Sequence, residues 1–411
     1  MSMVRTGFLN LSLRFLTLAS KFVLMLFMAR YLRPEDLGVY GILSASIAIS
    51  LYFLGLDFYV FNTREIIAQD EILQARMIRD QLACHALTYV IVLPLLMVIF
   101  LSGVLSREYL LWFYLLLVLE HLSQESSRLF ITLSRPLVAN VVLFLRSGAW
   151  IYVVIGFYFL GKGGGNLPVI LAGWSAGVLS SIALSLHALR RMPWGKVRKE
   201  PIDWTWIRRG IFVAIPFLGG TIALRAIEYG DRYFIQYFLG EAMVGVYTFY
   251  ISFANVVQVF VITGIIQILH PEIIGSFKQN HLDKYRRLIR KMGYLSFFAA
   301  VLVAAGIAAG IQPVLRLVGK SVYSSHVSVL WILLGSSVVA IVGSVPNYAL
   351  YVRGRDKSIF LANVLALAVS LAGNATLVER FALTGAAVTS LASNSTVVIS
   401  YLVMLRMERD G

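Results

Sequence analysis

The sequence has few charged residues and almost no cysteine. Only 14% of its 411 residues are Asp, Glu, Lys or Arg, whereas 59% are hydrophobic and the mean hydropathy is +0.79. This composition excludes an ordinary water-soluble domain. The single cysteine, Cys84, excludes an internal disulfide framework, and the histidines show no metal-ligand spacing, so we expect neither a structural metal nor a cofactor.

The sequence instead contains many long apolar runs. A helix needs about 20 apolar residues to cross a bilayer, and these runs reach that length. Arg14 and Lys21 interrupt the first run, which therefore does not read as a cleavable signal. The sequence predicts an all-α polytopic membrane protein with twelve transmembrane helices. The predicted spans are 8–30, 37–61, 82–105, 109–131, 137–160, 167–189, 210–234, 243–268, 293–315, 326–349, 358–378 and 383–404.

The net charge of +15 is unevenly distributed. Basic residues are concentrated in the junctions after the second, sixth, eighth and tenth predicted spans, and most of the other junctions are short and nearly charge-balanced. Because Lys and Arg are retained in cytoplasmic loops, this bias predicts that both termini are cytoplasmic. It also accounts for the positive charge without a nucleic-acid partner.

The two halves of the chain carry related motifs. YLRPEDLGVY (31–40) matches FLGEAMVGVY (238–247) at an offset of 207 residues, and further matches follow in the same order. We therefore predict a duplication with six helices in each half. The predicted parts are an N-terminal lobe, 1–190, a basic cytoplasmic linker, 191–209, and a C-terminal lobe, 210–411. Because six is even, the lobes are expected to be parallel repeats, as in known transporters with a substrate site between the halves.

Polar residues follow a helical spacing on the first and the seventh predicted span. They are Asn10, Arg14, Thr17 and Lys21 on the first, and Thr221, Arg225, Glu228 and Arg232 on the seventh. We expect the two faces to line a central cavity. The alternatives are that Arg225 pairs with Glu228 and that Arg14 reaches the cytoplasmic headgroups. Lys21 lies near mid-membrane with no acid within four residues on its own helix.

Three carboxylates are candidates for proton or ion coupling: Glu120 in the fourth predicted span, Asp57 near the end of the second, and Glu228. A carboxyl group held away from water can bind and release a proton, although Glu120 could equally make a polar contact between helices. Arg146 in the fifth span is a candidate for substrate binding or for charge balance.

The stretch ARYLRPEDLGVYGILSASIAISLYFLGLDFYVFNTREI, with its echo DRYFIQYFLGEAMVGVY, resembles the Wzx-type polysaccharide flippases of the multidrug/oligosaccharidyl-lipid/polysaccharide (MOP) exporter superfamily. The resemblance implies transfer of an undecaprenyl-diphosphate-linked oligosaccharide, such as an O-antigen unit, to the outer leaflet of a bacterial inner membrane by alternating access. It also implies that cations in the cavity receive the diphosphate or an acidic sugar. Arg14, Lys21 and Arg225 fit that role by position, with Arg146 as a further candidate. Polysaccharide polymerase machinery is a candidate partner.

Three other functions remain open at this point. A multidrug antiporter of the same superfamily should favour carboxylates or aromatic groups for cationic drugs, which Arg14 and Lys21 disfavour. A membrane glycosyltransferase or polymerase would place acid and base groups on a large outer loop, and the predicted outer junctions are short. A scramblase or scaffold would tolerate neutral substitution of the polar faces. We therefore expect a transporter and not an enzyme.

Overall fold

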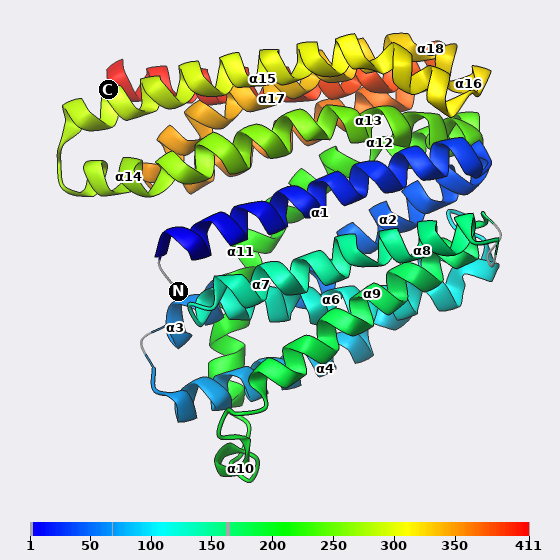
Figure 1. Ribbon diagram of the computed structural model, residues 1–411. Coiled ribbons are helices and arrows are strands. Elements are labelled where there is room, and N and C mark those ends of the chain that lie inside the picture. The colour runs from blue at the N-terminus through cyan, green and yellow to red at the C-terminus, as the bar shows by residue number, and fades with distance from the viewer. Residues whose placement is uncertain (1–2, 68, 162–164, 411) are drawn as a thin grey trace. The chain divides into compact units, whose positions relative to one another are not determined.

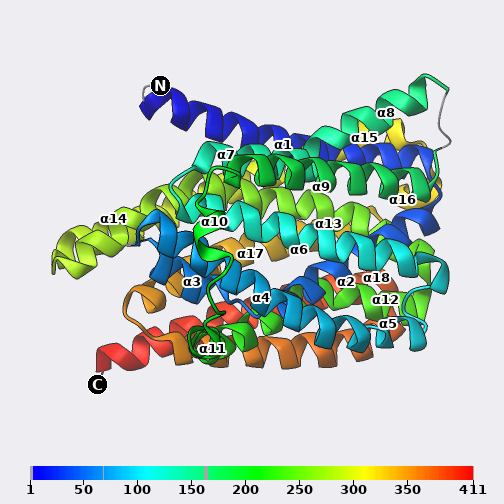
Figure 2. The ribbon, with the colours of Figure 1, turned by 90° about the horizontal axis from the view of Figure 1, so that it is seen from below.

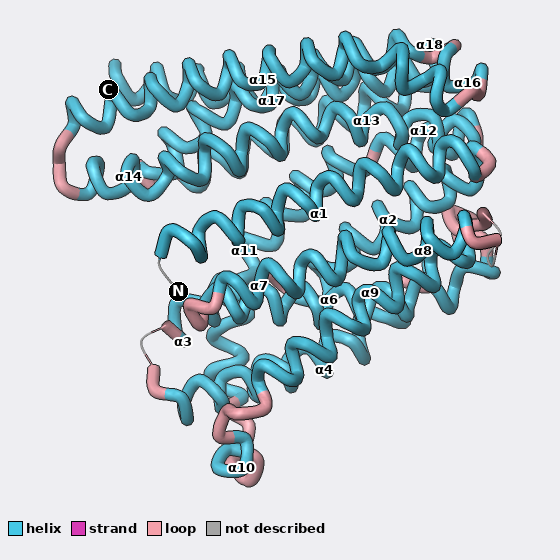
Figure 3. Tube along the Cα trace, in the orientation of Figure 1, coloured by secondary structure: helices cyan, strands magenta, loops and turns pink. Residues whose placement is uncertain are grey.

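The computed structural model describes residues 3–67, 69–161 and 165–410, and every regular element in this part of the chain is a helix (Figure 3). Ten helical stretches of the described chain are long and apolar enough to cross a bilayer. The prediction of an all-α, multi-pass membrane protein is thus confirmed. The ten stretches are Leu9–Tyr31, Pro34–Gly55, Glu71–Leu101, Pro136–Phe159, Leu167–Leu189, Trp204–Leu239, Glu241–Lys278, Leu282–Val318, Val327–Val352 and Asp356–Met407.

The difference between ten stretches and twelve predicted spans arises at two places. Helix α6 (Leu110–Thr132) is long enough to span, but its polar second half keeps it out of the ten. Helix α18 (Asp356–Asp410) covers the last two predicted spans, and its backbone leaves helical geometry at Ala382, where φ is 50°. The number of crossings therefore stays a prediction.

Backbone contacts divide the chain into two compact units. The N-terminal unit comprises Met1–Leu32 and Ile42–Ile222, and the C-terminal unit comprises Arg33–Gly41 and Ala223–Gly411. The division falls inside helix α11 (Trp204–Tyr229), not at the ends of the predicted linker. The two-lobe boundaries likewise stay a prediction.

Contacts between helices that are far apart in sequence build the N-terminal unit (Figures 1 and 2). Its other elements are α1 (Met3–Tyr31), α3 (Tyr59–Ile66), α4 (Glu71–Leu95), α5 (Val98–Leu101), the 3₁₀ turn η1 (Arg107–Tyr109), α7 (Pro136–Phe144), the π-helical turn η2 (Leu145–Ala149), α8 (Trp150–Phe159), α9 (Leu167–Leu189) and α10 (Trp194–Val197). Helix α6 packs against α7 and α9, while α1 packs against α7, η2 and α8. These contacts bring α1, α6, η2 and α9, which are far apart in sequence, into one bundle.

The C-terminal unit is organised around α17 (Val327–Val352), which packs against α13, α15 and α18 (Figure 1). Its other elements are α12 (Asp231–Leu239), α13 (Glu241–Val261), the π-helical turn η3 (Ile262–Ile266), α14 (Gln267–Lys278), α15 (Leu282–Val318) and α16 (Ser321–Ser324). Gly319 ends α15 in the left-handed region at φ 72°, where glycine carries no Cβ penalty. The first residues of α2 (Pro34–Gly55) also belong to this unit.

The starts of α2 and α13 touch through a pair of glycines. A Cβ atom on Gly38 would lie 1.9 Å from the carbonyl oxygen of Glu241, and one on Gly245 would lie 2.0 Å from that of Pro34. Both glycines and both carbonyl groups are related by the 207-residue offset of the sequence motifs. The repeated LGVY and VGVY motifs thus place small residues where the two helix backbones approach closely.

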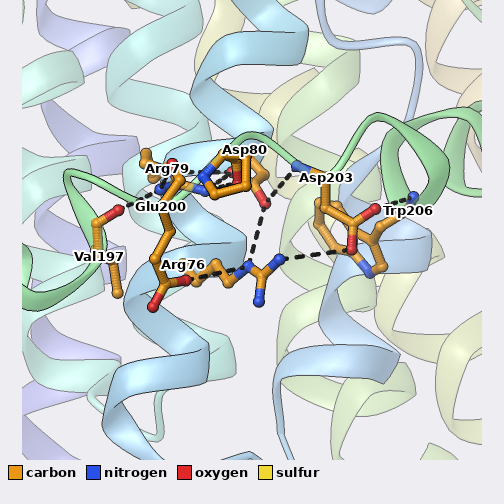
Figure 4. Close-up of polar contacts among 8 residues, drawn as sticks. Arg76, Arg79, Asp80, Val197, Glu200, Asp203 and Trp206 are labelled. Carbon is orange, nitrogen blue, oxygen red and sulfur yellow. Dashed lines mark hydrogen bonds and ion pairs between the residues drawn. The ribbon is translucent and has the colours of Figure 1, made fainter.

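A charge network fastens the stretch before α11 to α4 (Figure 4). Arg79 donates hydrogen bonds to the backbone carbonyl groups of Glu200 and Pro201 at 2.9 and 3.0 Å. Its guanidinium also lies 2.6 Å from the buried carboxylate of Asp80, whose other oxygen accepts a hydrogen bond from the backbone of Asp203. Asp203 in turn caps the first turn of α11. The network therefore determines where α11 begins.

Candidate functional site

Lys21 is exposed on α1, on a helix whose neighbouring polar groups are buried. The hydroxyl groups of Thr17 and Ser20 donate hydrogen bonds to the backbone carbonyl groups of Leu13 and Leu16, one turn back, at 2.8 and 2.6 Å. Their protons are therefore used within α1 and are not offered to a ligand. The Lys21 ammonium makes no hydrogen bond or close ion pair with any described residue, although Glu120 and Arg146 lie within electrostatic range. On the predicted polar face of α1, the Lys21 ammonium can therefore contact a ligand without first breaking a hydrogen bond.

Arg14, two positions before Lys21 on this face, is held by the side-chain amides of Asn140 and Asn10. Its Nε donates to Oδ1 of Asn140 at 3.1 Å, and Nδ2 of Asn140 donates to Oδ1 of Asn10 at 2.9 Å. These bonds join α1 to α7. Arg14 therefore has a structural role beside any role in binding.

Glu120 on α6 is buried, with 8% of its surface exposed, and contacts side chains from two other segments, one by a hydrogen bond and one by an ion pair. Nε1 of Trp174 on α9 donates to its Oε1 at 2.6 Å, and Nε of Arg146 lies 3.5 Å from its Oε2. The structure thus brings together Glu120 and Arg146, two of the predicted site residues, with Lys21 within electrostatic range of both. Two cations and one carboxylate leave this cluster with one net positive charge.

The sequence places these groups through a π-helical turn and two glycines. Arg146 lies in η2, and π-helical turns are frequent at functional sites because the extra residue redirects side chains. Gly173 and Gly177 on α9 allow the ring of Trp150 to approach, since a Cβ on Gly177 would lie 2.3 Å from it. A hydrogen bond of 2.6 Å between the hydroxyl groups of Ser123 and Ser181 joins α6 to α9 nearby. Close packing of α9 on η2 therefore holds Trp174 and Arg146 at the carboxylate of Glu120.

Asp57 lies between α2 and α3 with φ at 50° and only 2% of its surface exposed. The nearby polar group consists of Glu125, Arg128 and Tyr59: Arg128 forms an ion pair of 2.6 Å with Glu125 and lies 3.8 Å from the centre of the Tyr59 ring. Asp57 is thus a buried carboxylate next to a second polar group of the N-terminal unit.

Arg225 and Glu228 form an ion pair on α11, as the local alternative predicts. Their side chains remain 33% and 41% exposed. Gly230, between α11 and α12, keeps helical dihedral angles, so the helical direction continues past Tyr229. Arg232 is buried beside Asp231 at 3.5 Å and donates a hydrogen bond to the backbone carbonyl of Glu228 at 3.0 Å.

The chain has a sequence match to the family model described as polysaccharide biosynthesis protein, over residues 3–277. The chain belongs to this family. No significant match was found among curated protein sequences. Together with the fold described next, the match confirms the predicted resemblance to the polysaccharide flippases of the MOP superfamily at the level of family and fold.

Solved structures similar to this polysaccharide biosynthesis protein are multidrug resistance MATE transporters of the MOP superfamily. An inward-facing one has a TM-score of 0.78 at 15% identity, covering 98% of this chain and 97% of its own. An outward-facing one has a TM-score of 0.63 at 14% identity, covering 98% and 94%. A MOP transporter from Pyrococcus furiosus, described as having a binding pocket of reverse polarity, has a TM-score of 0.59 at 14% identity, covering 97% and 93%. At these identities the likeness shows a shared fold.

Sequence reasoning missed two parts of this family member's polar interior. Trp174 was not a candidate, because a tryptophan in an apolar run reads as packing. His85 and His121 stack with ring centres 4.7 Å apart, and the Tyr89 hydroxyl lies 2.7 Å from Nδ1 of His121. In the sequence, the only indication of this histidine pair is that His121 directly follows the candidate residue Glu120. In the described part of the chain, His, Cys, Asp and Glu nowhere gather in threes that could hold a metal ion.

Proposed function

We propose that the protein is a flippase that moves an undecaprenyl-diphosphate-linked oligosaccharide from the cytoplasmic to the outer leaflet of a bacterial inner membrane. Membership of the polysaccharide biosynthesis protein family and the MATE-like fold support a transporter. The observation that carries the proposal is the cluster of Lys21, Glu120 and Arg146, which has an excess positive charge on membrane-spanning helices.

An unneutralised cation is costly at this depth. A Lys or Arg at the bilayer centre costs about 2.5–3.5 kcal/mol on insertion scales, and such residues mark ligand sites or pathways. A diphosphate or an acidic sugar would offset that cost through charge-assisted hydrogen bonds. Lys21 is exposed to receive it, and Nη1 of Arg146 is buried without a hydrogen bond to any described residue. We assign Lys21 the main contact and Arg146 a supporting one.

Glu120 is the coupling residue in this proposal. Its carboxylate lies beside both cations, so protonation would raise the charge of the cluster by one unit and strengthen anion binding. Deprotonation would weaken binding and favour release. Asp57 and Glu228 remain secondary candidates; Glu228 is paired with Arg225.

The topology completes the proposal. Counting α6 and both parts of α18 gives twelve crossings, with two six-helix lobes working by alternating access and both termini in the cytoplasm. The outward-delivered product would then reach the polysaccharide polymerase machinery. A multidrug antiporter is the second candidate, since the similar solved structures include multidrug transporters, but an excess of cations in the cluster disfavours cationic drugs.

The test is leaflet transfer of a fluorescent undecaprenyl-diphosphate oligosaccharide in proteoliposomes that contain the full-length protein. We expect protein-dependent transfer that Lys21→Gln abolishes and Arg146→Gln reduces. Lys357→Gln is the matched control, because Lys357 is an exposed lysine at the start of α18. Transfer by Lys21→Gln at the wild-type rate would reject the site. No transfer by the wild type, with a range of sugars and ion gradients, would reject the flippase.

A further inference from the structure

The C-terminal unit contains a cavity of about 230 Å³ between the end of α11, α17 and the two parts of α18. Its polar lining consists of the amides of Asn347, Asn363 and Asn394 and the hydroxyl groups of Ser344, Tyr348 and Tyr401. The remaining lining residues, all within the described chain, are aliphatic or glycine, so no carboxylate, ammonium, guanidinium or imidazole group faces this cavity. The volume is several times the roughly 30 Å³ that a water molecule occupies.

Three residues of the cavity lining, Asn347, Tyr401 and Asn363, form a chain of two hydrogen bonds, which we call the relay. Nδ2 of Asn347 donates to the Tyr401 hydroxyl at 2.8 Å, and that hydroxyl donates to Oδ1 of Asn363 at 3.0 Å. A hydroxyl has one proton to donate, so the relay runs in one direction. If both amides were rotated, the relay would run the other way. In either case one amide presents its NH₂ group and the other its carbonyl oxygen, each without a hydrogen bond to a described residue.

The free side of each amide lies at the cavity. Asn363 has only 2% of its surface exposed, and its amide makes one hydrogen bond to a described residue, Tyr401, which leaves its other polar atom for a ligand in the cavity that it lines. Asn394 is half-buried: its Nδ2 donates to Ser336 at 2.9 Å, and its carbonyl oxygen makes no bond to a described residue. A ligand that bonds to these atoms replaces water that would otherwise do so.

The chemistry of the lining selects the class of ligand. A charged group would lose its hydration without an opposite charge in the wall, which is strongly unfavourable. A purely apolar group would leave the amides unsatisfied. A sugar ring offers hydroxyl groups that donate and accept together, and carbon-bound hydrogens that pack against Tyr348 and the aliphatic side chains.

We propose that this cavity is a subsite for one uncharged sugar residue, a hexose or an N-acetylhexosamine, with Asn347 and Asn363 as the recognition groups. The proposal rests on the proposed flippase function and names part of its substrate. It assigns the two chemical halves of a lipid-linked oligosaccharide to different units: the anionic headgroup to Lys21 in the N-terminal unit, and a neutral sugar to the C-terminal unit.

The test is saturation-transfer-difference NMR on the full-length protein in nanodiscs. The probes are the methyl glycosides of glucose, galactose and N-acetylglucosamine, with glucuronate as the charged counterpart. We expect saturation of at least one neutral glycoside and not of glucuronate. Asn363→Leu should weaken the signal at least about fivefold, the loss expected for one hydrogen bond between neutral groups. Ser344→Leu, which fills the cavity and leaves the relay intact, should abolish it.

Ser395→Leu is the matched control, because Ser395 is a half-buried serine on α18 that bonds its own helix and does not line the cavity. It should retain the signal, as should Lys21→Gln. Equal signals from glucuronate, no signal from any neutral glycoside, or signals unchanged in both cavity variants would overturn the subsite. Because transfer is measured separately, sugar binding by a protein that transfers no lipid would contradict the proposed function and leave the subsite supported.

Discussion

Replacing Glu120 by Gln should destabilise the protein, because Arg146 loses its ion-pair partner and Lys21 loses the attraction of a nearby carboxylate. Glutamine keeps the volume of the side chain and an oxygen that can accept the hydrogen bond from Trp174, so the substitution removes chiefly the charge. Arg146, with 15% of its side chain exposed, would then lie beside Lys21 without an acid at contact distance. The perturbation therefore reports the electrostatics of the cluster.

The magnitude follows from burial. Removing one partner of a buried ion pair costs about 3–5 kcal/mol, because the remaining charge is left uncompensated. The 3.5 Å separation and the residual exposure of Arg146 place Glu120→Gln at the lower end, about 3 kcal/mol. Removing Arg146 as well relieves that repulsion, so the double variant should be about 1–3 kcal/mol more stable than the sum of the two single losses.

The assay is reversible unfolding in mixed micelles, with the free energy of unfolding measured for the wild type, the two single variants and the double variant. Glu108→Gln, at an exposed glutamate in η1, should change that free energy by no more than about 0.5 kcal/mol. Wild-type stability in Glu120→Gln, or strict additivity in the double variant, would refute the claim that Glu120 compensates the charge of Arg146.

Two further predictions concern the packing that positions the helices. Gly38→Ala should lower the free energy of unfolding by about 1–3 kcal/mol, because its Cβ would meet the carbonyl group of Glu241. The control is Gly306→Ala, whose Cβ would have no atom within 4 Å; it should be neutral or mildly stabilising in the same unfolding measurement. Arg79→Ala should cost about 1.5–3 kcal/mol, because it removes the closer of the two guanidinium groups at the buried carboxylate of Asp80 and leaves Arg76 at 4.0 Å. Limited proteolysis should then cut faster between 190 and 203. Equal proteolysis rates in Arg79→Ala and the wild type would show that the network does not hold this stretch.

The existence of the helices could be predicted from the apolar runs, but their ends could not. The predicted span 293–315 lies inside α15, which begins at Leu282, and the span 82–105 begins eleven residues after α4 does, at Glu71. Hydropathy identifies the apolar residues that can lie in the bilayer core. The helical backbone hydrogen bonds continue into the polar residues on either side of that segment, so the helix is longer than the apolar run. The π-helical turn at Leu145–Ala149 has no signature in composition.

The candidate site could be predicted only where its residues share a helix. Spacing along one helix placed Arg14 and Lys21 on a common face and allowed Arg225 to reach Glu228. The contact of Glu120 with Arg146 joins α6 to η2, and periodicity within one segment carries no information about which segments pack together. The same limit hid the cavity of the C-terminal unit, whose amides lie on α17 and on both parts of α18.

The most direct test of the central claim is the affinity of the purified protein for undecaprenyl diphosphate, measured by native mass spectrometry for the wild type, Lys21→Gln and Lys357→Gln. Loss of one charge-assisted hydrogen bond, about 1.5–3 kcal/mol, predicts that Lys21→Gln binds roughly 10- to 150-fold more weakly. Lys357→Gln should bind as the wild type does. Equal affinity in all three proteins would contradict the assignment of Lys21 to the anionic headgroup.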